Sequence, residues 1–131
     1  MKGYIVNLEN KTISNDNFRE VLYTGKFSQL VLMSLLPGEE IGLEVHSLDQ
    51  FIRVEKGMGV AILDGVEHQL SDGSAVIVPA GANHNIINTS ATDDLKLYTI
   101  YSPPEHQDGV KFKTKVEAES ANEHFNGQTT E

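Results

Sequence analysis

Turn signals recur at short, regular intervals along most of the chain. Turns containing Gly, Pro or Asp separate short segments rich in Val, Ile, Leu, Phe and Tyr. The Asp-Gly pairs at 64–65 and 72–73 favour the positive φ angles of tight hairpins. This spacing predicts an all-β fold of antiparallel strands in a sandwich or barrel. The strands are expected at 18–23, 29–36, 42–46, 50–55, 59–64, 66–70, 75–78, 84–88 and 95–102, with a hairpin over 59–70.

The two ends of the chain do not follow this strand pattern. Residues 7–17 are polar and are expected to form a loop or an irregular edge. Paired prolines at 103–104 end the last strand, and residues 114–125 lack period-two alternation but contain good helix formers. Thr114 with Glu117 predicts a capping box at the start of a short helix. We expect a single domain over 1–131, with a barrel core at about 18–103 and a tail at 104–131 that contains the helix.

The composition excludes several classes of site. The chain has 131 residues, 39% of them hydrophobic, which suffices for one buried core. It has no cysteine, so disulfides, thiolate zinc sites and cysteine nucleophiles are ruled out. A net charge of −9 disfavours nucleic acid and anionic membranes as partners. With no signal peptide and no apolar run longer than LVLMSLL at 30–36, a cytoplasmic protein is expected.

Polar residues with metal-binding side chains interrupt the predicted strands at one place. Glu44 and His46 are two residues apart, so on a strand both side chains point to the same side, about 6.5–7 Å apart. Gln50 begins the next strand, and His84 starts another after the turn PAGAN. These four side chains could converge on one ion. The simpler alternative is a solvated strand face with a loop histidine.

These residues also carry a family resemblance. Residues 38–57 read G-x5-E-x-H-x3-Q-x6-G, and residues 73–88 read G-x5-P-x-G-x2-H-x3-N. The second stretch resembles the second motif of the cupin superfamily at every defined position. The first resembles the first cupin motif, in which histidine occupies the first two ligand positions and glutamate the third. Here Glu44 replaces one histidine and Gln50 replaces the glutamate.

The resemblance implies a jelly-roll barrel with one divalent metal ion inside one mouth. The expected ligands are Glu44, His46, Gln50 and His84. Two imidazoles, one carboxylate and one amide suit Zn, Fe, Mn or Ni. Phosphomannose isomerases, which are zinc cupins, have a similar inventory of ligands. Some cupins, however, have lost their metal.

The resemblance leaves three functions open. The first is a metal-dependent isomerase or lyase acting on a small polar metabolite, such as a sugar or a keto or hydroxy acid. The second is an iron-dependent dioxygenase, and the third is a non-catalytic cupin that binds a small molecule. A titratable group beside the metal would favour an enzyme. The resemblance also implies a homodimer.

Several other polar residues have simpler interpretations. Tyr98 and Tyr101 lie on opposite faces of one predicted strand, so only one can point inward. His68 is expected on an exposed hairpin strand, and His124 is expected as a solvated residue of the tail helix. His106 follows two prolines and is a candidate to fold over the barrel mouth.

Overall fold

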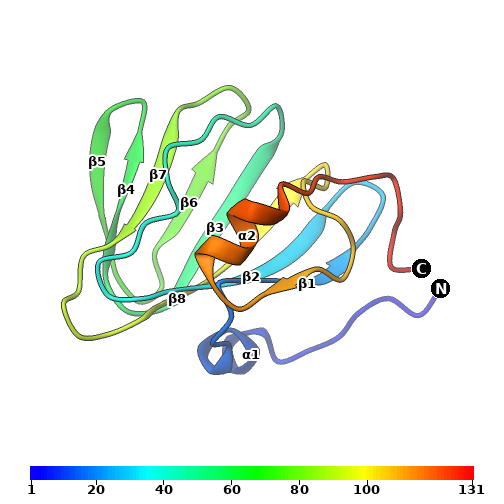
Figure 1. The fold of residues 1–131 in the computed structure, drawn as a ribbon, viewed down its shortest axis with the longest axis horizontal. Coiled ribbons are helices and arrows are strands. Elements are labelled where there is room, and N and C mark those ends of the chain that lie inside the picture. The colour runs from blue at the N-terminus through cyan, green and yellow to red at the C-terminus, as the bar shows by residue number, and fades with distance from the viewer.

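Two antiparallel sheets face one another and form the barrel (Figure 1). The computed structural model describes all residues, 1–131. The larger sheet has the strand order β6-β3-β8-β2-β1-β9, and the smaller has the order β5-β4-β7. The elements are α1 (Leu8–Ser14), β1 (Arg19–Thr24), β2 (Gln29–Leu35), β3 (Asp49–Lys56), β4 (Gly59–Leu63), β5 (Val66–Leu70), β6 (Ala75–Val78), β7 (His84–Asn88), β8 (Leu95–Ser102), β9 (Lys111–Phe112) and α2 (Lys115–Ala121). The all-β fold with a short C-terminal helix is therefore confirmed.

The core lies between the two sheets and is built by alternation along the strands. Gln50, Ile52 and Val54 of β3 are all buried, as period-two spacing requires for one inward face. Strand β8 lies between β2 and β3, and its residue Leu97 is completely buried. Gln50 is thus a polar side chain on an otherwise apolar inner face.

The predicted hairpin over 59–70 is confirmed as β4 and β5. Asp64 and Gly65 connect the two strands with φ angles of 46° and 83°. Positive φ at both central residues matches the twist of the flanking strands, and Asp-Gly is among the sequences that tolerate it best.

The predicted strand at 42–46 is wrong as a regular strand. Glu44 forms only an isolated bridge, with His84 opposite it. Gly42 has a φ of 108°, and its N–H donates to the side-chain oxygen of Asn85 at 2.9 Å in place of a backbone partner. The positive φ at Gly42 bends the segment, so it runs beside β7 without a continuous ladder.

The predicted loop at 7–17 is also wrong, because residues Leu8–Ser14 form α1. The side chain of Asn7 accepts a hydrogen bond from the N–H of Asn10 and caps the helix. Thr12 is fully buried, and its hydroxyl donates to the carbonyl of Leu8 at 2.6 Å. Local capping and tertiary burial therefore give a polar segment a helical turn.

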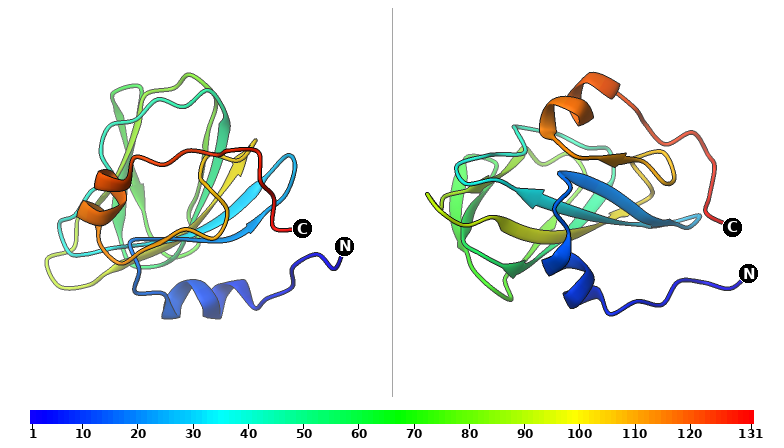
Figure 2. Two further views of the ribbon diagram at one scale, coloured as in Figure 1. Left: turned by 45° about the vertical axis from the view of Figure 1, so that its right-hand side comes forward. Right: turned by 60° about the horizontal axis from the view of Figure 1, so that its bottom comes forward.

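The tail begins as predicted and then diverges. Thr114 caps α2 by accepting from the N–H of Glu117 at 3.2 Å. The helix ends at Ala121, earlier than expected, because Asn122 adopts the left-handed conformation. Figure 2 shows α2, in orange, over the open side of the barrel. Neither helix has the length and apolar character needed to cross a membrane.

Candidate metal centre

Three of the four expected ligands meet inside the barrel mouth. Glu44, His46 and His84 each offer one ligand atom, and these atoms all lie within 4.8 Å of one another. Glu44 Oε2 lies 3.0 Å from His46 Nε2 and 3.8 Å from His84 Nε2. Reciprocal backbone hydrogen bonds of 2.9 Å between Glu44 and His84 fix the two facing segments. The bridge at Glu44 therefore brings the two cupin-like motifs together.

The orientation of His84 leaves a free ring nitrogen at this site. Nδ1 lies 3.1 Å from the carbonyl oxygen of Ala82. Because a carbonyl can only accept, Nδ1 carries a proton, and Nε2 is the nitrogen on which the ring can present a lone pair. That Nε2 is buried and has no hydrogen-bond partner. A backbone carbonyl on one nitrogen and an open lone pair on the other is the usual arrangement of a metal-binding histidine.

Gln50 shows a similar unsatisfied atom. Its side chain is 3% exposed, and Nε2 donates to Thr99 Oγ1 at 3.0 Å. Its Oε1 is buried without a partner. Gln50 lies opposite Tyr101 in the β3–β8 register, and the Tyr101 ring packs edge-on against His46 at 5.9 Å. Gln50 thus belongs to the same inner wall, and its role as a fourth ligand stays a prediction.

The chemistry of the donor set fits a divalent ion. Burial opposes the ionisation of Glu44, but its hydrogen bond with His46 and the charge of Arg19 hold the pKa of Glu44 below its usual value. The same hydrogen bond raises the pKa of His46 against the effect of burial. Binding of an ion would displace the proton shared by Glu44 and His46, because metal ligands must be deprotonated. The two unsatisfied buried atoms, His84 Nε2 and Gln50 Oε1, are acceptors that an ion would satisfy.

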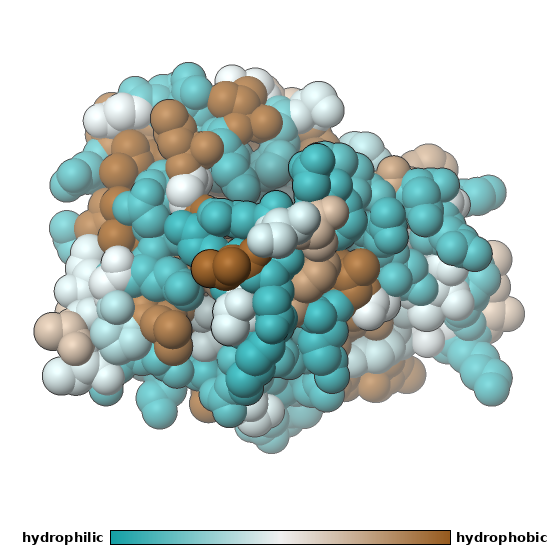
Figure 3. Space-filling model, viewed as in Figure 1, coloured by the Kyte–Doolittle hydropathy of each residue, from teal (hydrophilic) through white to brown (hydrophobic).

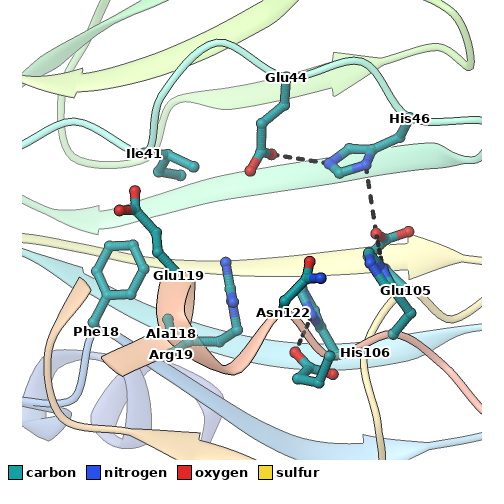
Figure 4. Close-up of a pocket in the computed structure, with 12 residues that line it drawn as sticks. Phe18, Arg19, Ile41, Glu44, His46, Glu105, His106, Ala118, Glu119 and Asn122 are labelled. Carbon is teal, nitrogen blue, oxygen red and sulfur yellow. Dashed lines mark hydrogen bonds and ion pairs between the residues drawn. The ribbon is translucent and has the colours of Figure 1, made fainter. Parts of the chain in front are cut away.

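A pocket of about 270 Å³ lies between Glu44 and His46 on one side and Arg19 and His106 on the other (Figure 4). Its opposite wall comes from β1, from the segment after β8 and from the tail. Figure 3 shows mainly hydrophilic side chains on the face that carries α2. The charged and titratable residues of this wall are Arg19, Glu105, His106, Glu119, Glu123 and His124.

His106 folds over the barrel mouth, as the sequence suggested. It is 7% exposed, and its Nδ1 lies 2.7 Å from Glu123 Oε1. Its Nε2 lies 3.4 Å from the hydroxyl of Tyr101. Burial lowers the pKa of His106, although the hydrogen bond with Glu123 opposes this. The ring is therefore neutral near pH 7, with Nδ1–H donating to Glu123 and Nε2 accepting from Tyr101.

Glu123 and Tyr101 complete this group. Burial opposes the ionisation of Glu123, but hydrogen bonds from His106 and from the N–H of Gln107 lower its pKa overall. Burial raises the pKa of Tyr101, so its hydroxyl keeps its proton. Tyr101 is 3% exposed and points inward, whereas Tyr98 contacts Phe51. The opposite orientation of the two tyrosines is confirmed.

Both remaining histidines are exposed as expected, but His124 lies beyond the end of α2 and not within the helix. His68 is exposed on β5. The side chain of His124 is 70% exposed and lies at the pocket rim, 3.6 Å from Glu105 Oε1. Neither belongs to the ligand group.

Four charged pocket residues were not singled out as site residues from the sequence: Arg19, Glu105, Glu119 and Glu123. Arg19 lies two residues before Val21 on β1 and therefore faces inward with it, but the burial of Val21 is visible only in the folded chain. Glu105 and Glu123 lie outside the regular strands, where alternation carries no information.

Comparison with known proteins agrees with this architecture. The family model described as a cupin domain matches residues 31–101. An uncharacterized protein of Bacillus subtilis, YrkC, is 46% identical over 127 residues, which are 92% of this chain and 68% of YrkC. The crystal structure of BH2720 from Bacillus halodurans is 41% identical, with a TM-score of 0.88, and the match covers 91% of this chain and 95% of that one.

A more distant structure carries a functional description. A protein of Thermotoga maritima, described as a predicted oxalate decarboxylase, is 25% identical with a TM-score of 0.56. The match covers 60% of this chain and 68% of that one. From the family match, the similar sequences and the shared barrel, we conclude that the chain belongs to the cupin superfamily.

Proposed function

We propose that this cupin is a metal-dependent enzyme that acts on a small polar metabolite by isomerase or lyase chemistry. Glu44, His46 and His84 would hold one divalent ion, with the amide oxygen of Gln50 as a fourth ligand. The observation that carries the proposal is the buried, unpartnered Nε2 of His84 beside Glu44 and His46. Zn, Fe, Mn and Ni all suit this donor set. When bound, such an ion supplies Lewis-acid polarisation of a carbonyl or hydroxyl oxygen.

A proton-transfer group beside the ligands favours an enzyme over a non-catalytic binding protein. His106 is neutral and lines the same pocket as Glu44 and His46. In our proposal, His106 Nε2 takes a proton from the substrate while Glu123 stabilises the positive charge through Nδ1–H. Tyr101 would give up its hydrogen bond to Nε2 as the substrate proton arrives, and its hydroxyl oxygen would then accept a hydrogen bond from the new Nε2–H.

Two further points support isomerase or lyase chemistry over dioxygenase chemistry. The ligand inventory resembles that of the phosphomannose isomerases. The similar Thermotoga protein is described as a predicted oxalate decarboxylase, which is a lyase.

The test separates the metal from the proton transfer. Protein purified without an affinity tag is loaded in turn with Zn²⁺, Mn²⁺, Fe²⁺ and Ni²⁺, then screened against sugar phosphates and keto and hydroxy acids. For the best substrate, His106→Gln should lower kcat by about 10²- to 10⁴-fold while metal content is unchanged. His84→Ala should remove both metal and turnover. Turnover that survives complete chelation would contradict the metal mechanism, and full activity in His106→Gln would contradict the role of His106.

A further inference from the structure

Arg19 is a positively charged residue of the pocket, and no carboxylate of the protein forms an ion pair with it. It lies on β1, and Figure 4 shows its side chain pointing into the pocket from the wall opposite Glu44. Its Nε is buried without a hydrogen-bond partner. Its guanidinium lies 5.5 Å from the ring of Phe18, and it forms no hydrogen bond or close ion pair with a side chain of the protein.

The absence of an ion pair is notable because carboxylates surround this arginine. Four glutamates line the pocket, and each pairs with another residue. These pairs are Glu44–His46 at 3.0 Å, Glu105–His124 at 3.6 Å, Glu119–Lys115 at 3.8 Å and Glu123–His106 at 2.7 Å. None of these carboxylates forms an ion pair with the guanidinium of Arg19.

The buried Nε–H of Arg19 is costly for the fold because it has no hydrogen-bond partner. A buried donor without a partner loses its hydration and gains nothing in return. The guanidinium presents a rigid fork of N–H donors that matches the two oxygens of a carboxylate. A ligand carboxylate would therefore satisfy donors that the protein leaves free.

We propose that Arg19 binds a carboxylate of the substrate, so that the metabolite is a small organic acid and not a neutral sugar. The position of the reacting end of this acid, near Glu44 and His46, rests on the proposed function. A cavity of about 270 Å³ admits only a small molecule. The pocket contains four glutamates and one arginine, so it repels a phosphate, with about −1.5 to −2 charges at pH 7, more strongly than a singly charged carboxylate.

The chain offers a direct test because it has two arginines, Arg19 and Arg53. Arg53 Nε also lacks a hydrogen bond, but it lies 3.3 Å from Glu55 Oε1 in an ion pair outside the pocket, so Arg53 serves as the internal control. The probes are lactate and its neutral analogue lactamide, with glycolate and pyruvate as further acids. Each is titrated into ¹⁵N-labelled, Zn²⁺-treated protein at constant ionic strength, and the two arginine Nε–H signals are followed by NMR.

We expect saturable shifts of the Arg19 signal with the acids, none with lactamide, and an unmoved Arg53 signal. Arg19→Lys keeps the charge but loses the fork, and should weaken lactate binding by about tenfold or more. Arg53→Lys is the matched control and should leave binding unchanged. An Arg19 signal that no acid moves, or that lactate and lactamide move equally, would overturn the proposal.

A second titration separates this inference from the proposed function. His84→Ala protein is titrated with the same acids after its metal content has been measured. If the variant lacks metal and Arg19 still responds to lactate but not to lactamide, carboxylate recognition stands by itself. If wild-type protein binds no metal yet shows the Arg19 response, the metal mechanism fails and the carboxylate site remains.

Discussion

The hydrogen bonds of Glu123 hold the tail over the pocket, and replacing this residue tests that contact. Its two carboxylate oxygens accept from His106 Nδ1 and from the N–H of Gln107, each at 2.7 Å. Glu123→Gln keeps the shape of the side chain but leaves only one acceptor oxygen. Its N–H₂ group then faces either His106 Nδ1–H or the N–H of Gln107, both of which are donors. A hydrogen bond to a charged group contributes about 1.5–3 kcal/mol. The state in which the tail around Glu123 has separated from His106 and Gln107 should therefore become about 10- to 150-fold more populated.

Native-state hydrogen exchange measures this population directly. The N–H of Phe125 donates to the carbonyl of Glu105 at 2.8 Å, so its protection reports on closure of the tail. In Glu123→Gln the amides of Phe125 and Gln107 should exchange faster by that factor, while amides of β8 keep their protection. Glu119→Gln is the control, because Glu119 is 65% exposed and its pairing with Lys115 contributes little. Unchanged protection at Phe125 would refute this account of the tail.

Three further predictions concern the protonation state, the packing and the assembly. In urea titrations, the loss of unfolding free energy caused by His106→Gln should be largest above about pH 6.5 and should shrink at lower pH. Burial lowers the pKa of His106, so the unfolded wild-type chain binds a proton at this residue more readily than the folded one does. The wild type therefore loses stability through this residue as the pH falls, whereas the variant does not. Gly59→Ala should lower the free energy of unfolding by about 1–3 kcal/mol, because its Cβ would lie 2.5 Å from the carbonyl oxygen of Ile87; thermal unfolding checks this, with Gly25→Ala as the milder control. We expect a homodimer, so light scattering should give about twice the 14.4 kDa mass of one chain. A mass of one chain would contradict the expected homodimer.

The features that the sequence predicted correctly depend on local chemistry. The Asp64–Gly65 hairpin follows from backbone preferences at two neighbouring residues. The inward position of Gln50 follows from alternation with Ile52. Glu44 and His46 were expected on a regular strand, and an isolated bridge with His84 is enough to bring all three together.

The features that the sequence did not predict depend on contacts between distant segments. Helix α1 is polar, and the burial of Thr12 is visible only in the folded chain. The contact between Glu123 and His106 joins an irregular tail to an irregular loop, and neither has a periodic signal. Arg19 lies on a correctly expected strand, but its inward orientation is clear only once Val21 is known to be buried.

Metal content tests the central claim most directly. Protein purified without an affinity tag, and matched His84→Ala and His68→Ala variants, would be equilibrated with Zn²⁺, desalted and analysed by inductively coupled plasma mass spectrometry. His68 is the control because its exposed side chain lies outside the ligand group. We predict one ion per chain in the wild type and in His68→Ala, and almost none in His84→Ala. A wild-type protein without metal, or equal metal content in His84→Ala, would contradict the assignment of Glu44, His46 and His84 as a metal centre.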